Sequence, residues 1–334
     1  MESLSHRRVG PLRRSSRLIP RARRAAEIRS EWIELSDVSR RGSRESRMLV
    51  RHEQLCPVCN NAMVTDLVPA TFRCPACGFF ASKLPARINS VQRIDEDARE
   101  RALKTIRLSN FEQLFTECLN LLPSGGSLLD IGCAHGWFIE AATGRGITCV
   151  GIEPDLEMER RARSAGHNVI AGTFPDAMPD GARFDAITFN DVFEHLPDVN
   201  RMAHILPDYL KPGGTVIVNL PVADGLIFRT ARLVARFGVR DPLNRMWQAG
   251  LPSPHLSYFT GKTLRQLFEA AGFSCVRQGQ LQALSSNGLY DRIRYDRDIG
   301  FFKAVAFYTV ARAAVAVSRV FPSDIQYFVF RLRT

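Results

Sequence analysis

The stretch LLDIGCAHGWFIE, residues 128–140, places an acid and two glycines where an apolar run gives way to a helical pattern. Asp130 ends the run, and Gly132 and Gly136 bracket the turn that follows. A dinucleotide-binding turn, G-x-G-x-x-G, would need a glycine at Ala134 and a further one three residues later. A phosphate-binding P-loop would need the triplet G-K-[ST], which does not occur in this turn. The turn therefore indicates a ligand that presents no phosphate to it.

A second acid, Glu153, ends the next β-rich run, ITCVGIE. A carboxylate at the tip of a strand can accept two hydrogen bonds from the vicinal hydroxyls of a ribose. The two glycines would let a flat, uncharged part of the ligand approach the backbone, and Asp130 supplies a negative group suited to a cation. Together these features predict S-adenosylmethionine, a cationic nucleoside, as the ligand. The alternative is an ordinary glycine-rich turn that binds nothing.

Two cysteine pairs, Cys56-Pro-Val-Cys59 and Cys74-Pro-Ala-Cys77, are separated by fourteen residues. Two C-x2-C turns can present four thiolates to one metal ion in a closed tetrahedral site. We predict structural zinc, which would stabilise a ribbon too small to have its own core; a rubredoxin-like iron site, disulfides and free thiols are the alternatives. The loop between the pairs has one Arg, one Asp and no aromatic cluster for stacking on bases, which argues against nucleic-acid binding by the ribbon.

Two histidines stand where a base could act on an acceptor. His195 lies in DVFEHLPD, just beyond the fourth β-rich run, and His255 follows a long insertion before the next helical segment. Methyl transfer from a sulfonium is an in-line displacement that depends mainly on alignment and exclusion of water, but an oxygen nucleophile of high pKa also needs a base. We predict a catalytic role for His195 or His255; the alternative for each is a hydrogen-bonded structural histidine.

The elements that would position these residues alternate between short β-rich runs and helical segments, the pattern of a parallel sheet with crossover helices. The strand candidates are SLLDIG, ITCVGIE, NVIAG, FDAITFN, GTVIVNLP and FSCVRQG. Ligands bind at the carboxyl edge of such sheets. We therefore expect an α/β, Rossmann-like doubly wound sheet with the site at that edge.

Composition and pattern divide the chain into five parts. These are an Arg-rich tail (1–51), a zinc ribbon (52–86), a helical connector (95–122), the α/β domain (123–285) and a C-terminal helical extension (286–334). Residues 222–252 interrupt the alternation of the α/β domain with an amphipathic, basic helical candidate and a polar, Pro-containing segment. An insertion of this size is expected to form a lid over the carboxyl edge.

The positive charge of the chain is concentrated in its tail. Residues 1–51 carry fourteen Arg and six acidic residues, and thus +8 of the net charge of +11. The tail is interpreted as a solvated, disordered arm; a transit peptide and a translation start at Met48 are the alternatives. Eight cysteines without a recognisable secretory signal predict a reducing compartment, and hence the cytoplasm.

Two amphipathic or apolar segments, 225–240 and 301–321, are candidates for contact with a membrane surface. The second, FFKAVAFYTVARAAVAVSRVF, contains Lys303, Arg312 and Arg319, so it has no uncharged apolar run of eighteen residues. Three interpretations stay open for it: a helix packed on the domain or a partner, a helix lying on a membrane, and a true span.

A series of ordered motifs resembles those of class I S-adenosylmethionine-dependent methyltransferases, specifically a bacterial subgroup with a C-x2-C…C-x2-C-G segment ahead of the methyltransferase domain. The motifs are LLDIGCAHG (128–136), VGIEPD (150–155), FDAITFNDVFEHLPD (184–198), LKPGG (210–214), PHLSYFT (254–260) and AAGF (270–273). The family usually has a glycine where this chain has Ala134, and we expect alanine to fit there with an ordinary φ.

The resemblance implies that residues of the glycine turn and of the strand ends surround the cofactor. They are Asp130, Gly132, Cys133, Ala134 and Gly136 at its methionine part, Glu153 and Pro154 at its ribose, Thr173 and Phe174 at its adenine, and Asn190 and Asp191 toward the acceptor.

These observations predict methyl transfer to a small-molecule acceptor, namely a sugar, a glycan precursor or a lipid-linked compound. One alternative is an RNA or protein methyltransferase that uses the ribbon for recognition. The near-neutral body of the chain argues against it, as does Asn190-Asp191-Val192-Phe193 in place of the N-P-P-[YF] tetrad for planar amines. Another alternative is a non-catalytic, cofactor-binding scaffold that recruits a partner.

Overall fold

The computed structural model describes residues 54–89, 96–118, 122, 125–283, 300–318 and 323–333. The chain divides into two units, Met1–His52 and Glu53–Thr334, and all of these residues belong to the second. The predicted Arg-rich tail over 1–51 lies outside the described residues.

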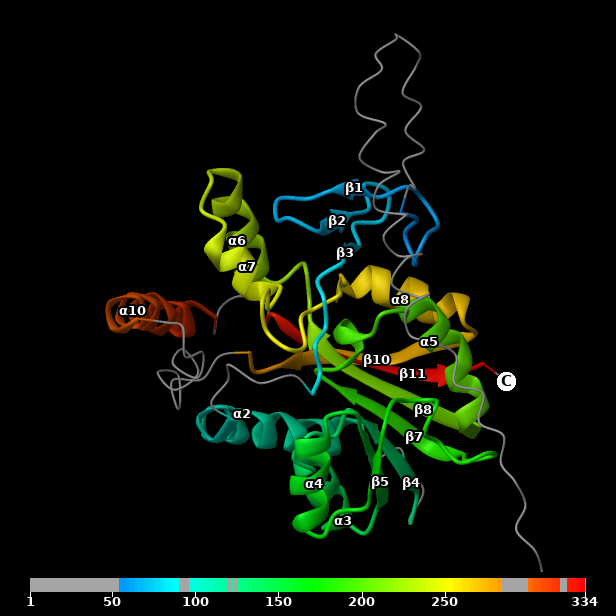
Figure 1. Cartoon of the computed structure of the whole chain (residues 1–334). Coiled ribbons are helices and arrows are strands. Elements are labelled where there is room, and N and C mark those ends of the chain that lie inside the picture. The colour runs from blue at the N-terminus through cyan, green and yellow to red at the C-terminus, as the bar shows by residue number, and fades with distance from the viewer. Residues whose placement is uncertain are drawn as a thin grey trace, which may run out of the picture. The chain divides into compact units, whose positions relative to one another are not determined.

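A seven-stranded sheet runs through the described part of the second unit, with the strand order β10-β11-β8-β7-β4-β5-β6 (Figure 1). The strands are β4 (Ser127–Ile131), β5 (Thr148–Glu153), β6 (Val169–Ala171), β7 (Phe184–Asn190), β8 (Leu210–Pro221), β10 (Phe273–Leu281) and β11 (Ile325–Leu332). The five strands from β4 to β8 pair in parallel. The strand order reverses direction on either side of β4, so the crevice beside its carboxyl end is the expected binding position for a ligand.

All six predicted strands are confirmed, and the Rossmann-like fold class with them. The helical segments expected to alternate with them are also present, as α3 (Trp137–Thr143), α4 (Leu156–Ser164), α5 (Val199–Ile205) and α8 (Gly261–Ala270). The predicted connector forms α2 (Glu96–Glu117).

In the described part of the C-terminal helical extension predicted over 286–334, α10 (Phe301–Ser318) is helical as expected. Residues 325–332 instead form β11, which pairs antiparallel with β8 on one side and β10 on the other. Tyr327, Phe328, Val329 and Phe330 are fully buried, because a strand inside a sheet covered on both faces is apolar on both of its sides. The sheet domain thus includes residues far beyond the predicted boundary at 285.

Alternate side chains of the strands enter two hydrophobic cores, one on each face of the sheet. On β4, Leu128 packs with α2, α3 and α4, whereas Leu129 packs with α5 and α8. Figure 1 shows the same division, with α2, α3 and α4 on one face and α5 and α8 on the other. This period of two fixes which residues at the strand ends face the site.

The ribbon and the sheet domain share a second, antiparallel sheet. Its strands are β1 (Val64–Thr65), β2 (Thr71–Arg73), β3 (Phe80–Ser82) and β9 (Ser257–Tyr258). The last of these lies in the PHLSYFT motif and pairs with β3 in the register Phe80↔Tyr258 and Ala81↔Ser257. The ribbon is therefore continuous with the segment that carries His255.

The insertion at 222–252 forms a helical hairpin of α6 (Leu226–Arg236) and α7 (Asp241–Met246). Phe228 and Trp247 are buried in a core of their own with Tyr258 of β9 and Val68 of the ribbon. Arg232 on α6 forms a two-pronged ion pair with Asp66 of the ribbon. The hairpin is thus anchored in part on the ribbon; its predicted role as a lid stays a prediction.

Within the described residues, no helix combines the length and the apolar composition needed to cross a membrane.

Candidate active site

The predicted cofactor turn joins β4 to α3 with a left-handed backbone. The φ angles are 70° at Gly132, 45° at Ala134 and 76° at Gly136. The expectation of an ordinary φ at Ala134 is therefore wrong: alanine adopts here the conformation that glycine adopts more readily. A Cβ on Gly132 would lie 2.6 Å from a methyl carbon of Val192, so glycine is needed where the turn approaches the segment after β7.

Glu153, at the carboxyl end of β5, is bound directly to this turn. Its Oε2 accepts a hydrogen bond from the Ala134 amide at 2.8 Å, and its Oε1 accepts one from the Asp155 amide at 2.9 Å. The side chain is only 6% exposed. A carboxylate offers about four acceptor positions, which is more than these two amides occupy.

Asp130, at the end of β4, is the innermost acid of the site. Its Oδ1 accepts hydrogen bonds from Thr188 Oγ1 at 2.9 Å and from Asn190 Nδ2 at 2.8 Å. Asn219 on β8 donates to Asn190 Oδ1 at 2.6 Å, which fixes the orientation of the Asn190 amide. Complete burial raises the pKa of Asp130 to about 7, although the two donors act in the opposite direction.

Three other residues predicted for the cofactor make different contacts. The Cys133 side chain is buried, and burial raises the pKa of its thiol. The Phe174 ring is buried against Tyr209 at 4.8 Å between centroids, whereas Thr173 directs its hydroxyl to Asp176. Cys133 and Phe174 can therefore contribute to a cofactor site chiefly through their backbones.

The loop after β7 carries Asp191, one of the two residues predicted to lie toward the acceptor. Asp191 has a φ of 54°, unusual for a residue other than glycine. Its carboxylate lies 3.3 Å from the guanidinium of Arg107, which comes from α2. No sequence pattern singled out Arg107, because it stands among several charged residues of an expected helix. The carbonyl of Pro154, the residue after β5, accepts a hydrogen bond from the side-chain amide of Asn89 at 3.1 Å.

His195 and His255, the two candidate bases, lie together, and the buried acid Glu194 completes the group. Glu194 Oε1 is 3.9 Å from His195 Nε2 and 4.0 Å from His255 Nε2. The two imidazole rings meet edge to face, with centroids 4.7 Å apart. Glu194 Oε2 is buried and makes no hydrogen bond within the described structure. Burial raises the pKa of Glu194 well above its usual value.

The hydrogen bonds distinguish the two histidines. Tyr258 donates its hydroxyl proton to the Met246 carbonyl at 2.8 Å, so it must accept from His255 Nδ1 at 3.0 Å. His255 Nε2 then accepts from the Gln248 amide at 2.9 Å. Burial, and secondarily His195, lower the pKa of His255 well below its usual value. His255 is therefore held neutral, with both ring nitrogens engaged.

His195 has the geometry of a general base. Its Nδ1 lies 2.9 Å from the Pro254 carbonyl oxygen, which can only accept, so this nitrogen carries the proton. The neutral ring then has its lone pair on Nε2. The side chain is partly exposed, unlike that of His255. A fixed tautomer and partial access are what proton removal from an acceptor requires.

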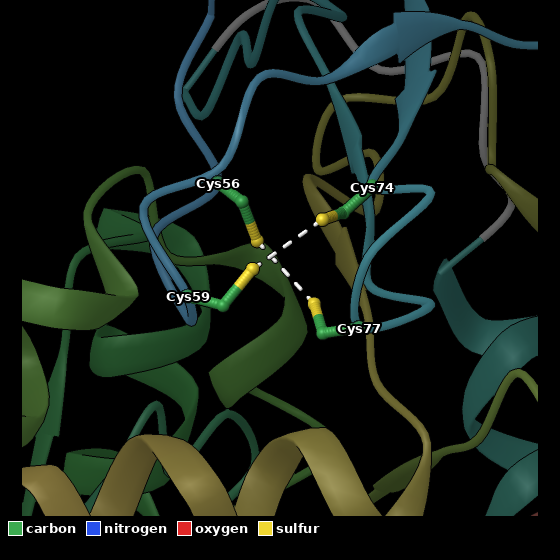
Figure 2. Close-up of side chains that lie close together, drawn as sticks. All are labelled: Cys56, Cys59, Cys74 and Cys77. Atoms are coloured by element: carbon green, nitrogen blue, oxygen red, sulfur yellow. Dashed lines mark hydrogen bonds between the residues drawn. The ribbon is translucent and has the colours of Figure 1, made fainter.

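The four cysteines of the ribbon converge on one point (Figure 2). The Sγ atoms of Cys56 and Cys77 are 3.6 Å apart, those of Cys59 and Cys74 are 3.4 Å apart, and all four lie within 4.8 Å of one another. Sulfur atoms in a tetrahedral site with Zn–S bonds of about 2.3 Å are separated by roughly 3.8 Å. The donor set therefore fits a structural zinc ion, and burial raises the pKa of the Cys56 thiol to about 11 without one.

The parallel sheet, the glycine turn and the acids at its carboxyl edge define a nucleoside-binding α/β enzyme, and the family follows from comparison. A family model described as a methyltransferase domain matches residues 98–278, more than half of the chain. The chain belongs to this family of S-adenosylmethionine-dependent methyltransferases. The interpretation as a non-catalytic scaffold is accordingly set aside.

Curated relatives match a smaller part of the chain than the family model does. A ubiquinone biosynthesis O-methyltransferase of Xanthomonas axonopodis pv. citri (strain 306) is 30% identical over 127 residues, which are 35% of this chain and 53% of that protein. An uncharacterized methyltransferase of Mycobacterium sp. (strain KMS) is 32% identical over 103 residues, 30% of this chain and 40% of that protein. The matched regions thus span about half of these relatives or less.

Solved structures share the fold at low identity. One chain of the complex between the Trm112 methyltransferase activator of Haloferax volcanii and a methyltransferase superposes with a TM-score of 0.53 and 18% identity, covering 73% of this chain and 98% of that one. The cyclopropane synthase MmaA2 of Mycobacterium tuberculosis gives 0.51 and 16%, covering 72% and 90%. These likenesses support the fold alone.

Proposed function

We propose that the enzyme transfers a methyl group to an oxygen of a small-molecule acceptor: a sugar, a glycan precursor or a lipid-linked compound. The observation that carries this proposal is His195, whose tautomer is fixed by the Pro254 carbonyl at the carboxyl edge of the sheet. An oxygen acceptor has a proton to lose, and a positioned imidazole can take it. The name of the Xanthomonas relative, an O-methyltransferase, agrees with this acceptor atom.

The residues around the glycine turn would hold the cofactor. Glu153 would accept hydrogen bonds from the ribose hydroxyls, since its carboxylate is already oriented by two backbone amides. Asp130 would lie near the cationic methionine part, and Asn190 and Asp191 would separate cofactor from acceptor. S-adenosylmethionine supplies an electrophilic methyl group and leaves as the uncharged thioether.

His195 would then accept the acceptor's proton on Nε2 as the new O–CH₃ bond forms and the S–CH₃ bond breaks. Glu194 and His255 would hold the imidazole in place, because both lie beside it and are themselves buried. The cysteine quartet would bind zinc as a structural ion and take no part in the transfer. We further propose a cytoplasmic location with access to membranes.

Radiolabelled methyl transfer into a lysate separated into lipid, glycan, RNA and protein fractions tests the function. Label should enter the lipid or glycan fraction, and His195→Ala should lower its rate about 10²- to 10⁴-fold. His204→Ala is the matched control, since His204 is an exposed histidine on α5. Label confined to RNA or protein would reject the proposed acceptor class, and a His195→Ala enzyme of full activity would reject the base.

A further inference from the structure

The turn between α6 and α7, residues 236–240, presents apolar side chains to solvent. The sequence of this turn is RFGVR, and Phe237 is 81% exposed while Val239 is 57% exposed. Gly238, with a φ of 91°, lets the chain reverse between them. Leu233, one helical turn before Phe237, is also exposed. Apolar groups this exposed mark a contact surface when they gather on one element.

The hairpin that carries this turn is fixed to the rest of the protein. Phe228, Ala231 and Ala235 lie on the opposite side of α6 and are buried. Arg232 is tied to Asp66 by the ion pair and lies over the Phe80 ring at 4.3 Å. The exposed residues are thus the outward stripe of an anchored helix and its terminal turn.

The charge around the turn is positive. Residues 225–246 contain five Arg and a single acid, Asp241, and Asp66 compensates only Arg232. Arg236 and Arg240 are exposed and flank the two apolar residues on either side. Apolar side chains between guanidinium groups match the boundary of an anionic bilayer, where acyl chains lie beneath phosphate groups.

A second exposed apolar group lies on the neighbouring helix. Phe302, in the first turn of α10, is 87% exposed, and Phe301 beside it is 59% exposed. The guanidinium of Arg245 on α7 lies 5.8 Å from the Phe307 ring of α10, and Figure 1 draws α10 beside the hairpin. The two elements can therefore contact one surface together.

We propose that the α6–α7 turn, with the first turn of α10, inserts into the headgroup region of an anionic phospholipid bilayer. A stable protein interface covers roughly 800 Å² and about 20–30 residues on each partner, which is far more than a projecting turn of five residues offers. Insertion into a bilayer needs only a few apolar side chains beside cations. This membrane contact is independent of the acceptor's identity, so it can hold whether or not the proposed function does.

Vesicle sedimentation of the full-length, zinc-loaded chain tests the contact, with phosphatidylcholine vesicles compared to vesicles that also contain phosphatidylglycerol. Phe237→Ser/Val239→Ser should weaken binding to the anionic vesicles by about tenfold or more, because the inserted apolar area is lost. Val64→Ser/Val276→Ser, which removes two exposed valines from β1 and β10, should leave binding unchanged.

A matched pair of double variants tests how much the positive charge of the turn contributes to vesicle binding. Arg236→Gln/Arg240→Gln should weaken binding to the anionic vesicles more than Arg160→Gln/Arg163→Gln, which removes the same charge from α4. This comparison separates the turn from the fourteen Arg of residues 1–51, which every variant retains. Titration with S-adenosylmethionine on each variant should show unchanged affinity, which keeps the membrane contact distinct from the cofactor site.

Three results would overturn the proposal: equal vesicle binding by the wild type and Phe237→Ser/Val239→Ser, an equal loss in the valine control, or a dimer that the turn variant abolishes while no vesicle binding is seen. The last, measured by light scattering, would assign the turn to a second copy of the chain. Brominated lipids give a direct readout, since they should quench the added fluorescence of Phe237→Trp but not of Val276→Trp.

Discussion

The hydroxyl of Ser82 donates a hydrogen bond to the backbone carbonyl of His255 at 2.7 Å. Ser82 ends β3 of the ribbon, and its amide also donates to the Leu256 carbonyl at 2.9 Å. Leu256 in turn donates to the Glu194 carbonyl at 2.8 Å. The ribbon is therefore hydrogen-bonded to the backbone of the segment in which His195, Glu194 and His255 meet.

Loss of the zinc ion proposed for the ribbon should loosen this segment before it affects the cofactor turn. Cys56→Ser/Cys74→Ser should lose about one zinc ion per chain, because two of four thiolates are gone. Hydrogen exchange should accelerate in residues 253–260, while β4 and β5 keep their protection and S-adenosylmethionine still binds. Metal analysis, exchange by mass spectrometry and calorimetric titration measure the three quantities.

Ser82→Ala provides a milder test of the same connection. The buried His255 carbonyl loses its hydroxyl donor, which should lower the free energy of unfolding by about 1–2 kcal/mol and raise exchange in 253–260 with zinc retained. Ser274→Ala, which removes a solvent-exposed 3.4 Å hydrogen bond from the Ser274 hydroxyl to the Arg331 carbonyl, is the control. Unchanged exchange in both the cysteine and the serine variants would show that the ribbon does not brace the histidine segment.

Glu153→Gln should weaken S-adenosylmethionine binding by about 10- to 100-fold, since hydrogen bonds to a charged group are worth about 1.5–3 kcal/mol. The change keeps the shape of the side chain but loses the charge and one acceptor oxygen. Glu157→Gln, on the exposed first turn of α4, should bind normally. Calorimetric titration measures both, and equal affinities would contradict the placement of the ribose at Glu153.

The sequence could predict residues at strand ends, but not the contacts that elements far apart in the chain bring to them. Asp130 and Glu153 could be placed at the edge of the sheet because apolar runs of strand length end at them and parallel strands bring those ends together, whereas the family resemblance pointed to Asn190. Arg107 could not be found, since a helix of mixed charge gives no indication of which side chain reaches Asp191. β11 was missed because a short run that is apolar on both sides is equally compatible with a buried helix.

The sequence also could not predict the backbone conformation of a turn residue, because that conformation depends on a partner from another strand. Ala134 adopts a left-handed φ because its amide must point at Glu153 Oε2, and that partner is known only once β4 and β5 are paired. The same holds for the histidines: motifs placed both near the edge, whereas the bonds to Gln248 and Tyr258 set His255 apart from His195.

Gly132→Ala and Gly146→Ala should separate backbone strain from steric overlap. The two glycines have nearly equal φ, 70° and 75°, but a Cβ on Gly146 would meet no atom within 4 Å, whereas one on Gly132 would lie 2.6 Å from Val192. Gly146→Ala should lower the free energy of unfolding by about 1–2 kcal/mol through its left-handed conformation, and Gly132→Ala by about 1–3 kcal/mol more through overlap. Urea unfolding measures the difference. Equal losses would mean that the loop after β7 moves away from the added Cβ at no cost in free energy.

Asp130 should make stability depend on pH. Its pKa is about 7 in the folded protein, above an ordinary value of 3.8, because burial disfavours the carboxylate. The stability contributed by the protonated form is fully present below about pH 4 and is lost as the pH rises through about 7. Asp130→Asn cannot ionise, so the wild type should lose stability relative to this variant as the pH is raised from about 4 to 8. Parallel pH profiles of thermal unfolding test this, and a constant difference between the two would contradict it.

Cofactor binding should lower the pKa of Asp130, which burial raises in the free protein. A sulfonium or ammonium group beside Asp130 favours its carboxylate and lowers its pKa, so binding near pH 7 should release protons. Calorimetric titration in two buffers of different ionisation enthalpy measures that release, which Asp130→Asn should abolish while its side-chain amide still accepts from Thr188 and Asn190. Proton release that persists in Asp130→Asn would assign the titrating group elsewhere, and its absence in the wild type would place the cofactor's cation away from Asp130.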